Sequence, residues 1–312
     1  MMTGVRTVPA QSESAGCATH RHPRALVLTN PHARRVREQL DLAVDRLCRR
    51  GFTLMLATPE RPTLFPQLIR DYREQVDLVI VAGGDGALNA TAGALVETRL
   101  PLGILPLGTA NDLARTLSIP TDLEGACDVI AAGHTRRIDL GRVNDTYFFN
   151  VASIGLGVSV TRRLTGDMKK RWGVLAYALT ALRAIWQFRP FRAEIRCDAA
   201  VWNARTVQIT VGNGRFYGGG MTIAEHAAID DQQLDLYSLE VRHWWHIVGL
   251  FWALRNGALA DRPGVRTCSG REITIHTRRR RRINTDGEIT ASTPAVFRLI
   301  PGAITVFAPS IE

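Results

Sequence analysis

Acidic residues inside glycine-rich turns are the residues of this 312-residue chain best suited to chemistry. The first such turn, Gly83-Gly84-Asp85-Gly86, follows a short apolar run from Asp77 to Ala82 that predicts a buried strand. Glycine leaves no Cβ in the way of a ligand, and the helix predicted from Ala87 to Glu97 favours a phosphate at its N-terminus. A carboxylate there repels a phosphate unless a metal ion or a proton transfer accounts for it. Asp85 is therefore a candidate catalytic residue.

The same order of strand, glycine turn and helix returns in the segment from Leu102 to Arg115. Gly108 lies in its turn, Thr109 offers a hydroxyl, and Asn111 begins the next helical pattern. Consecutive loops of this kind leave the same edge of a parallel sheet, where open α/β folds bind ligands. The pair predicts a nucleotide-binding edge. The alternative is two ordinary turns, with Asp85 as a helix N-cap.

A regular alternation of elements leads up to these loops. The patterns predict a strand over 25–29, a helix over 32–50, a strand over 52–57 and a helix over 64–72. They indicate a doubly wound parallel α/β domain over residues 25–137, preceded by a disordered tail over 1–24. Asn30 and Thr58 then lie on the same sheet edge as the glycine loops, either as turn caps or as ligand contacts.

After Gly133 the sequence pattern changes from alternating strands and helices to mainly strands, which continue to the end of the chain. It predicts a mainly antiparallel domain over 138–312, whose last few residues are free to return to the first domain. Helical patterns interrupt the strands at about 156–165, 173–188 and 244–256. A cleft between two such domains is a common place for an active site, and we expect it there.

Motifs along the chain from about residue 24 resemble one family, the catalytic domain of diacylglycerol and sphingosine kinases, and most closely its bacterial soluble lipid kinase branch. Besides the two glycine loops, the matching motifs are Asn150-Val151-Ala152-Ser153-Ile154-Gly155-Leu156-Gly157, Gly212-Asn213-Gly214 with Tyr217-Gly218-Gly219-Gly220-Met221, and Asp286-Gly287-Glu288. Several motifs in the right order are far more specific than any one of them. The resemblance implies a two-domain ATP-dependent lipid kinase.

The resemblance implies an ATP site at the edge of the first sheet. The residues that it places there are Asn30, Thr58, Gly83, Gly84, Asp85, Gly86, Ala87, Leu88, Asn89, Gly108, Thr109 and Asn111. Ala87 departs from the family pattern, which usually has threonine at this position. The change removes one hydroxyl contact to phosphate but keeps the backbone of the loop.

Asp286-Gly287-Glu288 by itself predicts a tight Asp-Gly hairpin between two strands. Within the resemblance it becomes catalytic, because phosphoryl transfer to an alcohol needs a carboxylate to accept the hydroxyl proton. The family pattern makes Glu288 the proton acceptor, with Asp286 close by. Asp85 is the rival base, since the related sphingosine kinases are thought to use the corresponding position.

A loop like Ala228 to Gln233 carries Mg²⁺ in the bacterial branch, bound by one aspartate side chain and backbone carbonyls. By position, the resemblance implies that Asp231 supplies the carboxylate and that Ala228 and Gln233 supply the carbonyls, an oxygen set that suits Mg²⁺. Gln232 stands where the family usually has glycine, which puts the loop geometry in question. The alternative is a solvated acidic turn before a strand.

Composition and charge agree with a globular protein that meets anionic partners. Hydrophobic residues make up 46% of the chain, and 39 Lys and Arg against 29 Asp and Glu give a net charge of +10. The five cysteines are scattered without a Cys-x-x-Cys pair, which predicts reduced thiols in a cytoplasmic protein. No run approaches the roughly 18 apolar residues that a membrane span needs. We therefore expect a cytoplasmic protein that meets its lipid at the inner membrane surface.

Three further segments concern that membrane. Residues 162–188 and 241–254 combine basic with aromatic and apolar residues, as an interfacial surface would, or form ordinary core-facing helices. The run Arg278 to Arg282 suits phosphates or anionic headgroups, and no nucleic-acid motif accompanies it. The sequence leaves open which lipid alcohol is phosphorylated and what the oligomeric state is. The alternatives to a lipid kinase are an NAD kinase-like enzyme and a non-catalytic protein that binds nucleotides or anionic lipids.

Overall fold

The chain folds into two compact units in a computed structural model. Unit 1 comprises residues 1–138 and 302–312, and unit 2 comprises residues 139–301. The residues that the structure describes are 5–10, 22–29, 34–155, 190–214, 216–217, 221–222, 228–240 and 264–310. Asn30 and the helices expected over 156–165, 173–188 and 244–256 lie outside these ranges.

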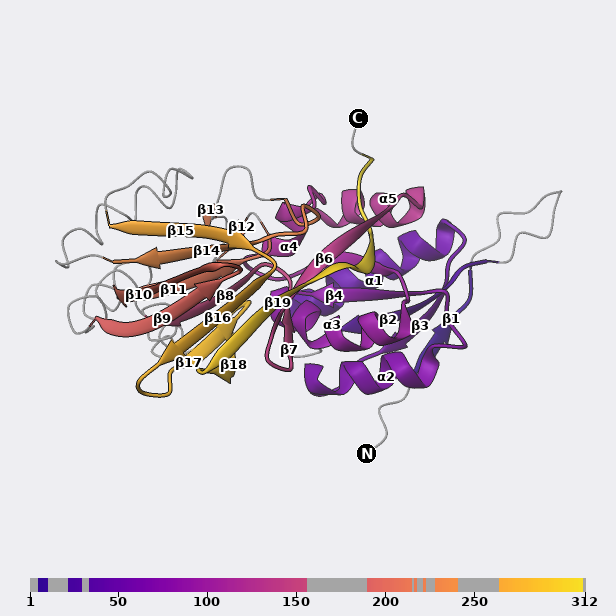
Figure 1. Ribbon diagram of the computed structural model, residues 1–312. Coiled ribbons are helices and arrows are strands. Elements are labelled where there is room, and N and C mark those ends of the chain that lie inside the picture. Colours follow the sequence, from indigo (N-terminus) through magenta and orange to yellow (C-terminus); the bar gives the residue numbers. More distant parts are fainter. Residues whose placement is uncertain are drawn as a thin grey trace, which may run out of the picture. The chain divides into compact units, whose positions relative to one another are not determined.

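Unit 1 is built on a mainly parallel sheet with the strand order β1-β3-β2-β4-β5-β19 (Figure 1). Its strands are β1 (Arg6–Val8), β2 (Arg24–Thr29), β3 (Thr53–Ala57), β4 (Leu78–Gly83), β5 (Leu102–Pro106) and the last residues of β19 (Ala295–Phe307). Neighbours from β3 to β19 run parallel, and the central strands β2, β4 and β5 are almost entirely buried. Strands covered on both faces read as continuous apolar runs, as these do.

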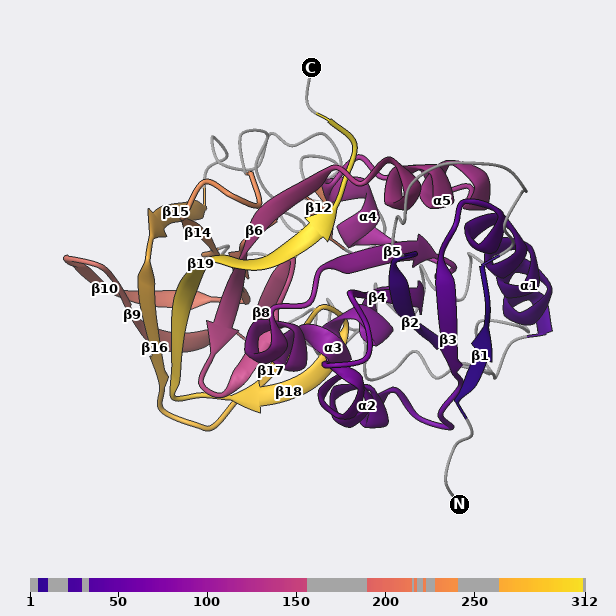
Figure 2. The same ribbon diagram turned by 90° about the vertical axis from the view of Figure 1, so that its right-hand side faces the viewer.

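Helices cover both faces of this sheet (Figure 2). They are α1 (Arg34–Arg49), α2 (Phe65–Tyr72) after a 3₁₀ turn at Pro62–Leu64, α3 (Asp85–Thr98), α4 (Asp112–Thr116) and α5 (Leu123–Ala132). On one face, Arg46 of α1 pairs with Glu124 and Asp128 of α5. On the other, Arg70 of α2 pairs with Glu97 of α3 at 2.6 Å. The expected doubly wound α/β class is confirmed.

Part of the expected disordered tail is instead a strand. Arg6 to Val8 forms β1, which pairs antiparallel with β3, Thr7 lying opposite Met55. The edge of a sheet presents unpaired backbone N–H and C=O groups, and a short β-branched segment can satisfy them. A three-residue strand carries too little pattern to be distinguished from a tail in the sequence.

Unit 2 is mainly antiparallel, as expected. One sheet has the order β15-β14-β11-β8-β17-β18, and in the other the first residues of β19 pair with β16, followed by β9 and β10. The strands are the end of β6 (Thr135–Val143), β7 (Thr146–Phe148), β8 (Val151–Gly155), β9 (Phe191–Cys197), β10 (Ala200–Thr206), β11 (Gln208–Gly212), β12 (Phe216–Tyr217), β13 (Met221–Thr222), β14 (Leu234–Leu239), β15 (Val265–Gly270), β16 (Glu272–Thr277), β17 (Arg282–Thr285) and β18 (Glu288–Ser292).

Apolar side chains from both sheets form the core of unit 2. Ile195 and Ile275 come from one sheet, and Ile209 and Leu236 from the other. The rings of Phe148 and Phe297 meet edge to face, with their centroids 6.4 Å apart. Period-two alternation places these residues on the inner faces, as along β9, where buried and less buried residues alternate.

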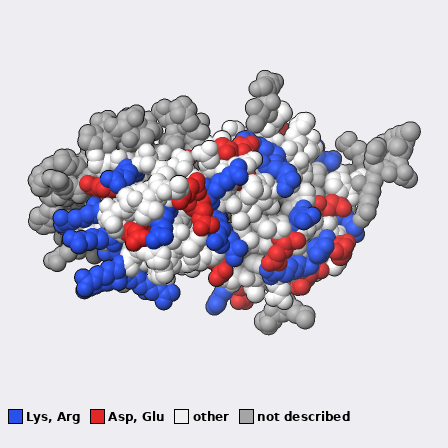
Figure 3. Space-filling model, viewed as in Figure 1, with Lys and Arg blue, Asp and Glu red and all other residues white. Residues whose placement is uncertain are grey.

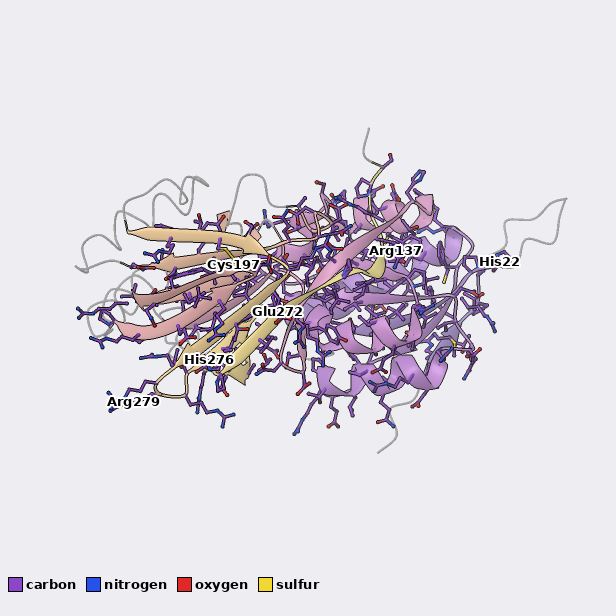
Figure 4. The ribbon with its side chains drawn as sticks, in the orientation of Figure 1. His22, Arg137, Cys197, Glu272, His276 and Arg279 are labelled. Atoms are coloured by element: carbon purple, nitrogen blue, oxygen red, sulfur yellow. A yellow bond between two sulfur atoms is a disulfide. The ribbon has the colours of Figure 1, made fainter. Side chains whose placement is uncertain are left out.

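The expectation that all cysteines are reduced thiols is wrong for one pair. Cys197 on β9 (Figure 4) and Cys268 on β15 form a disulfide, with their Cα atoms 6.7 Å apart. The two residues are separated by 71 positions, so their proximity depends on sheet pairing and cannot be read from spacing. Cys48 and Cys127 are buried free thiols. In the described part of the chain, no helix has the length and hydrophobicity needed to cross a bilayer.

Candidate active site

The carboxyl ends of four parallel strands form the candidate nucleotide edge in unit 1. The strands β3, β2, β4 and β5 lie side by side in that order and in the same direction. The chain order reverses between β2 and β4, and ligands of open α/β sheets bind at such a switch point. Thr58 lies exposed just after β3, and the two glycine loops follow β4 and β5.

The two glycine loops pack backbone against backbone. A Cβ added to Gly108 would lie 2.5 Å from the Cα of Gly84, and one added to Gly84 would lie 3.1 Å from the Cα of Gly108. The N–H of Leu107 donates to the carbonyl of Gly83 at 3.0 Å and joins the loops once more. The expectation that both loops leave one sheet edge is confirmed. Glycine is required here because of the close approach, whatever the ligand.

Helix α3 begins directly at the first loop and offers free backbone donors. The N–H groups of Ala87 and Leu88 donate back to the carbonyl of Gly84. Among the described residues this leaves those of Asp85 and Gly86 without an acceptor, as expected at the start of a helix. Such donors, together with the helix dipole, form an anion site. The Leu88 side chain is 2% exposed and packs in the core, so only its backbone is near the loop surface.

Asn111 holds the second loop together. Its side-chain oxygen accepts the N–H of Gly108 at 3.0 Å, and its Nδ2 donates to the carbonyls of Pro106 and Gly108, each at 3.1 Å. Asn111 has the left-handed φ of 51° that asparagine tolerates. Since its amide is committed to the loop, Asn111 shapes the site. Thr109, next to it, is exposed and has a hydroxyl to offer a ligand.

Asp85 connects the two loops. Its Oδ1 accepts the N–H of Leu113, in the first turn of α4, at 3.2 Å. The carboxylate therefore has a structural partner in addition to any chemical task.

Two further predicted site residues lie in the first turns of α3. Asn89 is partly buried. Ala87 lies against Gly83, where an added Cβ would come within 2.9 Å of the alanine methyl group.

In unit 2, Asp286 and Gly287 form the two-residue turn between β17 and β18, as the sequence predicts. Thr285 and Glu288 are paired across it, and both turn residues have positive φ, 47° and 98°. This is the geometry that favours Asp-Gly in hairpins. The turn thereby places both acidic residues of the motif at the end of one strand pair.

The Asp286 carboxylate is held by three backbone donors. Its Oδ2 accepts the N–H of Phe149 at 2.7 Å, and its Oδ1 accepts those of Asn150 and Val151 at 3.0 and 2.9 Å. Its own N–H donates to the carbonyl of Val151. Asp286 therefore anchors the hairpin to the segment before β8. The Asn150 motif indicated the importance of this segment, but the sequence gave no sign that it binds Asp286.

Glu288 has a contrasting environment. It is exposed, and its carboxylate has no hydrogen bond or ion pair within the described structure. A proton acceptor must be available to the substrate hydroxyl, so this freedom suits the task.

Asn213 also contacts the segment that binds Asp286, and it was not predicted from the sequence as a site residue. Its Nδ2 donates to the carbonyls of Asp139 and Phe149 at 3.1 and 2.7 Å, while its buried Oδ1 has no partner among the described residues. It fixes the same segment, Phe149 to Val151, that binds Asp286. Its motif Gly212-Asn213-Gly214 was the available signal.

In the loop expected to bind Mg²⁺, the side chain of Asp231 bridges the two ends of the loop. The two oxygens of Asp231 accept the N–H groups of Ala228 and Gln233 at 3.2 and 2.9 Å. Burial of the carboxyl group raises the pKa of Asp231 despite these bonds, and the neighbouring Asp235 and Asp139 raise it further. No group of three acidic, histidine or cysteine side chains that could hold a metal occurs among the described residues.

Gln232 explains how this chain accommodates the missing glycine. It adopts a left-handed φ of 61°, a conformation that favours glycine. Two bonds hold it there: its N–H donates to Asp139 at 2.8 Å, and its Oε1 accepts from Arg271 at 2.8 Å. The loop thus has a left-handed residue with two side-chain partners where the family usually has glycine.

Family models match both units. Residues 24–143 match the model described as the diacylglycerol kinase catalytic domain. Residues 150–308, about half of the chain, match the model described as the YegS C-terminal NAD kinase beta sandwich-like domain. The chain belongs to the bacterial soluble branch of the diacylglycerol kinase family. As a member of this family it is an enzyme, a lipid kinase.

Relatives match over nearly their whole length. The chain is 29% identical over 292 residues to proteins named diacylglycerol kinase from Staphylococcus aureus strains bovine RF122 / ET3-1 and MRSA252, covering 92% of this chain and 93% of each relative. A provisionally assigned diacylglycerol kinase from Bacillus anthracis strain Sterne has a similar solved structure, with a TM-score of 0.81 and 25% identity over 95% of this chain and 98% of that one. Another diacylglycerol kinase structure from this strain gives a TM-score of 0.77 at 24% identity, over 93% and 99%, and shows the same fold.

Proposed function

We propose that this lipid kinase transfers the γ-phosphoryl group of MgATP to a hydroxyl of a membrane lipid, with diacylglycerol as the first candidate. The observation that carries the proposal is the contact between Gly84 and Gly108 at the carboxyl ends of β4 and β5, a surface without Cβ atoms at the start of α3. The names of the Staphylococcus aureus relatives support the choice of lipid.

In this proposal the phosphates of ATP lie against the first glycine loop. The free N–H groups of Asp85 and Gly86 donate to them, and the exposed hydroxyls of Thr109 and Thr58 offer further contacts. Asn30 is assigned to the same edge by its position after β2. Gly84 and Gly108 keep the two loop backbones close, Gly83 accepts the N–H of Leu107, and Asn111 keeps the second loop in shape.

Glu288 is the proton acceptor in this proposal, in preference to Asp85. The Asp85 carboxylate already accepts the N–H of Leu113, whereas Glu288 is exposed and free within the described structure. Asp286 is a positioning residue, since both its oxygens are occupied by backbone donors. It fixes the hairpin from which Glu288 projects.

The Asp231 loop fits Mg²⁺, with the carbonyls of Ala228 and Gln233 as the other protein ligands. Mg²⁺ is commonly bound through one or two carboxylates and retained waters, so one aspartate suffices. Burial is the main cause of the raised pKa of Asp231, and the neighbouring Asp235 and Asp139 raise it further; a divalent cation beside these carboxylates would favour the ionised form of Asp231. A bound ion would supply this charge neutralisation and hold the loop before β14.

We further propose that the enzyme works in the cytoplasm and reaches its lipid as a peripheral protein at the inner membrane surface. The net charge of +10 supports attraction to anionic lipid. Lipid alcohols are insoluble in water, so their kinase must bind at the interface.

The test is a labelled-ATP assay over a panel of lipid alcohols in mixed micelles, with NAD as an additional acceptor. We expect label in a lipid, most in diacylglycerol. In Glu288→Gln we expect kcat to fall by about 10²–10⁴-fold with little change in the KM for ATP. Label in NAD and in none of the lipids would overturn the proposal, and Glu288→Gln with full activity would remove Glu288 as the base.

A further inference from the structure

A pocket bordered by arginines in unit 2 has no role in the function proposed above. Its volume is about 1080 Å³, and it lies between the β6–β7 turn at Asn144–Thr146, the arginine segment after β16, and the stretch from Ile289 to Pro294. Figure 3 shows arginines gathered over the part of unit 2 at the connection between β16 and β17. All lining residues belong to unit 2, so the pocket is complete within it.

Three guanidinium groups line this pocket without carboxylate partners. Arg278, Arg280 and Arg282 are exposed, and none of them forms an ion pair with the residues that the structure describes. The single acidic residue in the lining, Asp145, is paired with Arg142 at 3.1 Å. The pocket therefore carries an excess of positive charge that the described residues do not neutralise.

The arginine segment is held in place by threonines. Thr277 Oγ1 donates to the carbonyl of Arg279 at 2.8 Å, and Thr293 Oγ1 accepts the N–H of Arg281 at 2.9 Å. The N–H of Thr293 donates to the carbonyl of Arg281 at 2.8 Å. These bonds fix the backbone on both sides of the turn, so a ligand needs to order the arginine side chains but not the segment that carries them.

Arg281, in the middle of the segment Arg278 to Arg282, packs against the body of unit 2. Its guanidinium lies over the Phe191 ring, 3.9 Å from the centroid, and is half-buried. Burial lowers the pKa of Arg281, and the charge of Arg279 lowers it further. Arg279 projects outward from the turn (Figure 4). With Arg281 packed inward, its neighbours Arg280 and Arg282 are left to line the pocket.

Both the polar and the apolar parts of the lining indicate the class of ligand. Arginine forks match the geometry of phosphate oxygens, and the hydroxyl of Ser292, which accepts from Arg280 at 2.7 Å, lies among them. Ile289, 39% exposed, and Pro294 give the same pocket an apolar wall. A volume of about 1080 Å³ exceeds what a phosphate ion needs, which favours a phosphate attached to a larger, partly apolar molecule.

We propose that this pocket binds the phosphate of an anionic phospholipid in the membrane on which the enzyme works, at Arg278, Arg280 and Arg282. The lipid holds unit 2 at the surface and is not itself phosphorylated. The inference rests on the proposed function for its biological setting, but its binding test does not need turnover.

The test uses the full-length protein and vesicles of phosphatidylcholine with or without phosphatidylglycerol. In the double variant Arg278→Gln/Arg282→Gln we expect the Kd for the anionic vesicles to rise about 30-fold, since each arginine near such a surface contributes about 1 kcal/mol. The matched control is Arg192→Gln/Arg205→Gln, an exposed pair facing each other on β9 and β10 outside the pocket. It removes the same charge and should change the Kd by less than about threefold.

Equal losses in the two double variants would overturn the proposal, because they would show general surface electrostatics without a site. Inorganic phosphate provides the second arm, read by thermal stability. If phosphate stabilises the wild type but not Arg278→Gln/Arg282→Gln, while vesicle binding is the same in both, the ligand is free phosphate and the lipid proposal is wrong. Kinase activity on diacylglycerol in neutral detergent micelles should be retained by both double variants, which separates a failure here from a failure of the proposed function.

Discussion

Two carboxylates only two residues apart, Asp286 and Glu288, have opposite surroundings. Asp286 accepts three backbone N–H groups, and Glu288 is exposed without a partner in the described structure. One is therefore suited to hold a segment and the other to exchange a proton. A sequence motif shows both as acidic residues and cannot separate the two roles.

Substitution should separate them. Asp286→Ala leaves three backbone donors without their charged acceptor, and we expect it to lower the free energy of unfolding of unit 2 by about 3 kcal/mol. Glu288→Gln should change it by less than about 0.5 kcal/mol, as is usual for an exposed side chain. All six tryptophans, at positions 172, 186, 202, 244, 245 and 252, lie in unit 2, so urea unfolding followed by tryptophan fluorescence reports this unit. A stable Asp286→Ala protein would contradict the anchoring role.

A second residue-scale prediction concerns the loop contact. In Gly108→Ala the new methyl group would lie 2.5 Å from the Cα of Gly84, so the loops must separate. We expect ATP binding, measured by calorimetry, to weaken at least about tenfold, with about 1–3 kcal/mol lost in stability. Gly133→Ala is the control, since that glycine has a positive φ of 75° but nothing within 4 Å of an added Cβ. ATP binding unchanged in Gly108→Ala would show that the loops do not form the site.

At the scale of elements, α5 buries an ionisable group against the sheet. Cys127 is fully buried, and this burial raises the pKa of its thiol from about 9 to about 11. Below pH 9 the thiol is protonated in both the folded and the unfolded states. Between pH 9 and 11 only the unfolded state releases its proton, so this group's contribution to stability is lost as pH rises through that window.

The wild type should therefore lose about 2 kcal/mol of stability in this pH range that Cys127→Ala does not lose. The measurement is urea unfolding at several pH values, followed by far-ultraviolet circular dichroism. Other groups titrate in the same range, so the difference between the two proteins is the quantity to compare. Parallel curves for the two proteins would mean that Cys127 is accessible to water in the folded state.

Elements with a strong local pattern could be predicted from the sequence, and those set by distant pairing could not. The apolar runs of β2, β4 and β5 and the Asp-Gly turn before β18 are local signals, and the structure confirms them. The short strand β1 and the Cys197–Cys268 bond depend on partners far along the chain. Strand β1 forms because the edge strand β3 offers unpaired backbone groups, and the disulfide forms because β9 and β15 lie close together in different sheets. A local sequence pattern contains neither piece of information.

The candidate site divides in the same way. Residue types and family motifs indicate the two glycine loops and the hairpin at Asp286-Gly287-Glu288. They do not indicate which groups bind the polar side chains of these segments. The contact from Asp85 to Leu113 joins segments 28 residues apart, and that from Asp286 to Asn150 joins segments 136 apart. At Gln232 the sequence raised a question about the loop geometry, but it did not indicate the contacts to Asp139 and Arg271 that accompany its left-handed φ.

At the scale of the whole molecule, the Cys197–Cys268 disulfide constrains unit 2 alone. It closes a long loop between β9 and β15, which restricts the unfolded chain. Reductant should lower the stability of unit 2 by about 2–4 kcal/mol, measured by tryptophan fluorescence during urea unfolding. Cys268→Ser should be equally destabilised and insensitive to reductant. A wild type unaffected by reductant would show that the bond does not form in solution.

The strand β19 makes unit 1 depend on residues that follow unit 2 in the sequence. Val306 pairs with Leu102, so the nucleotide-binding sheet includes residues that the ribosome adds only after all of unit 2 has been made. The half of the enzyme that begins first is thus completed last. A premature stop near codon 302 would spare every residue of the β-rich unit and leave β5 with an open edge.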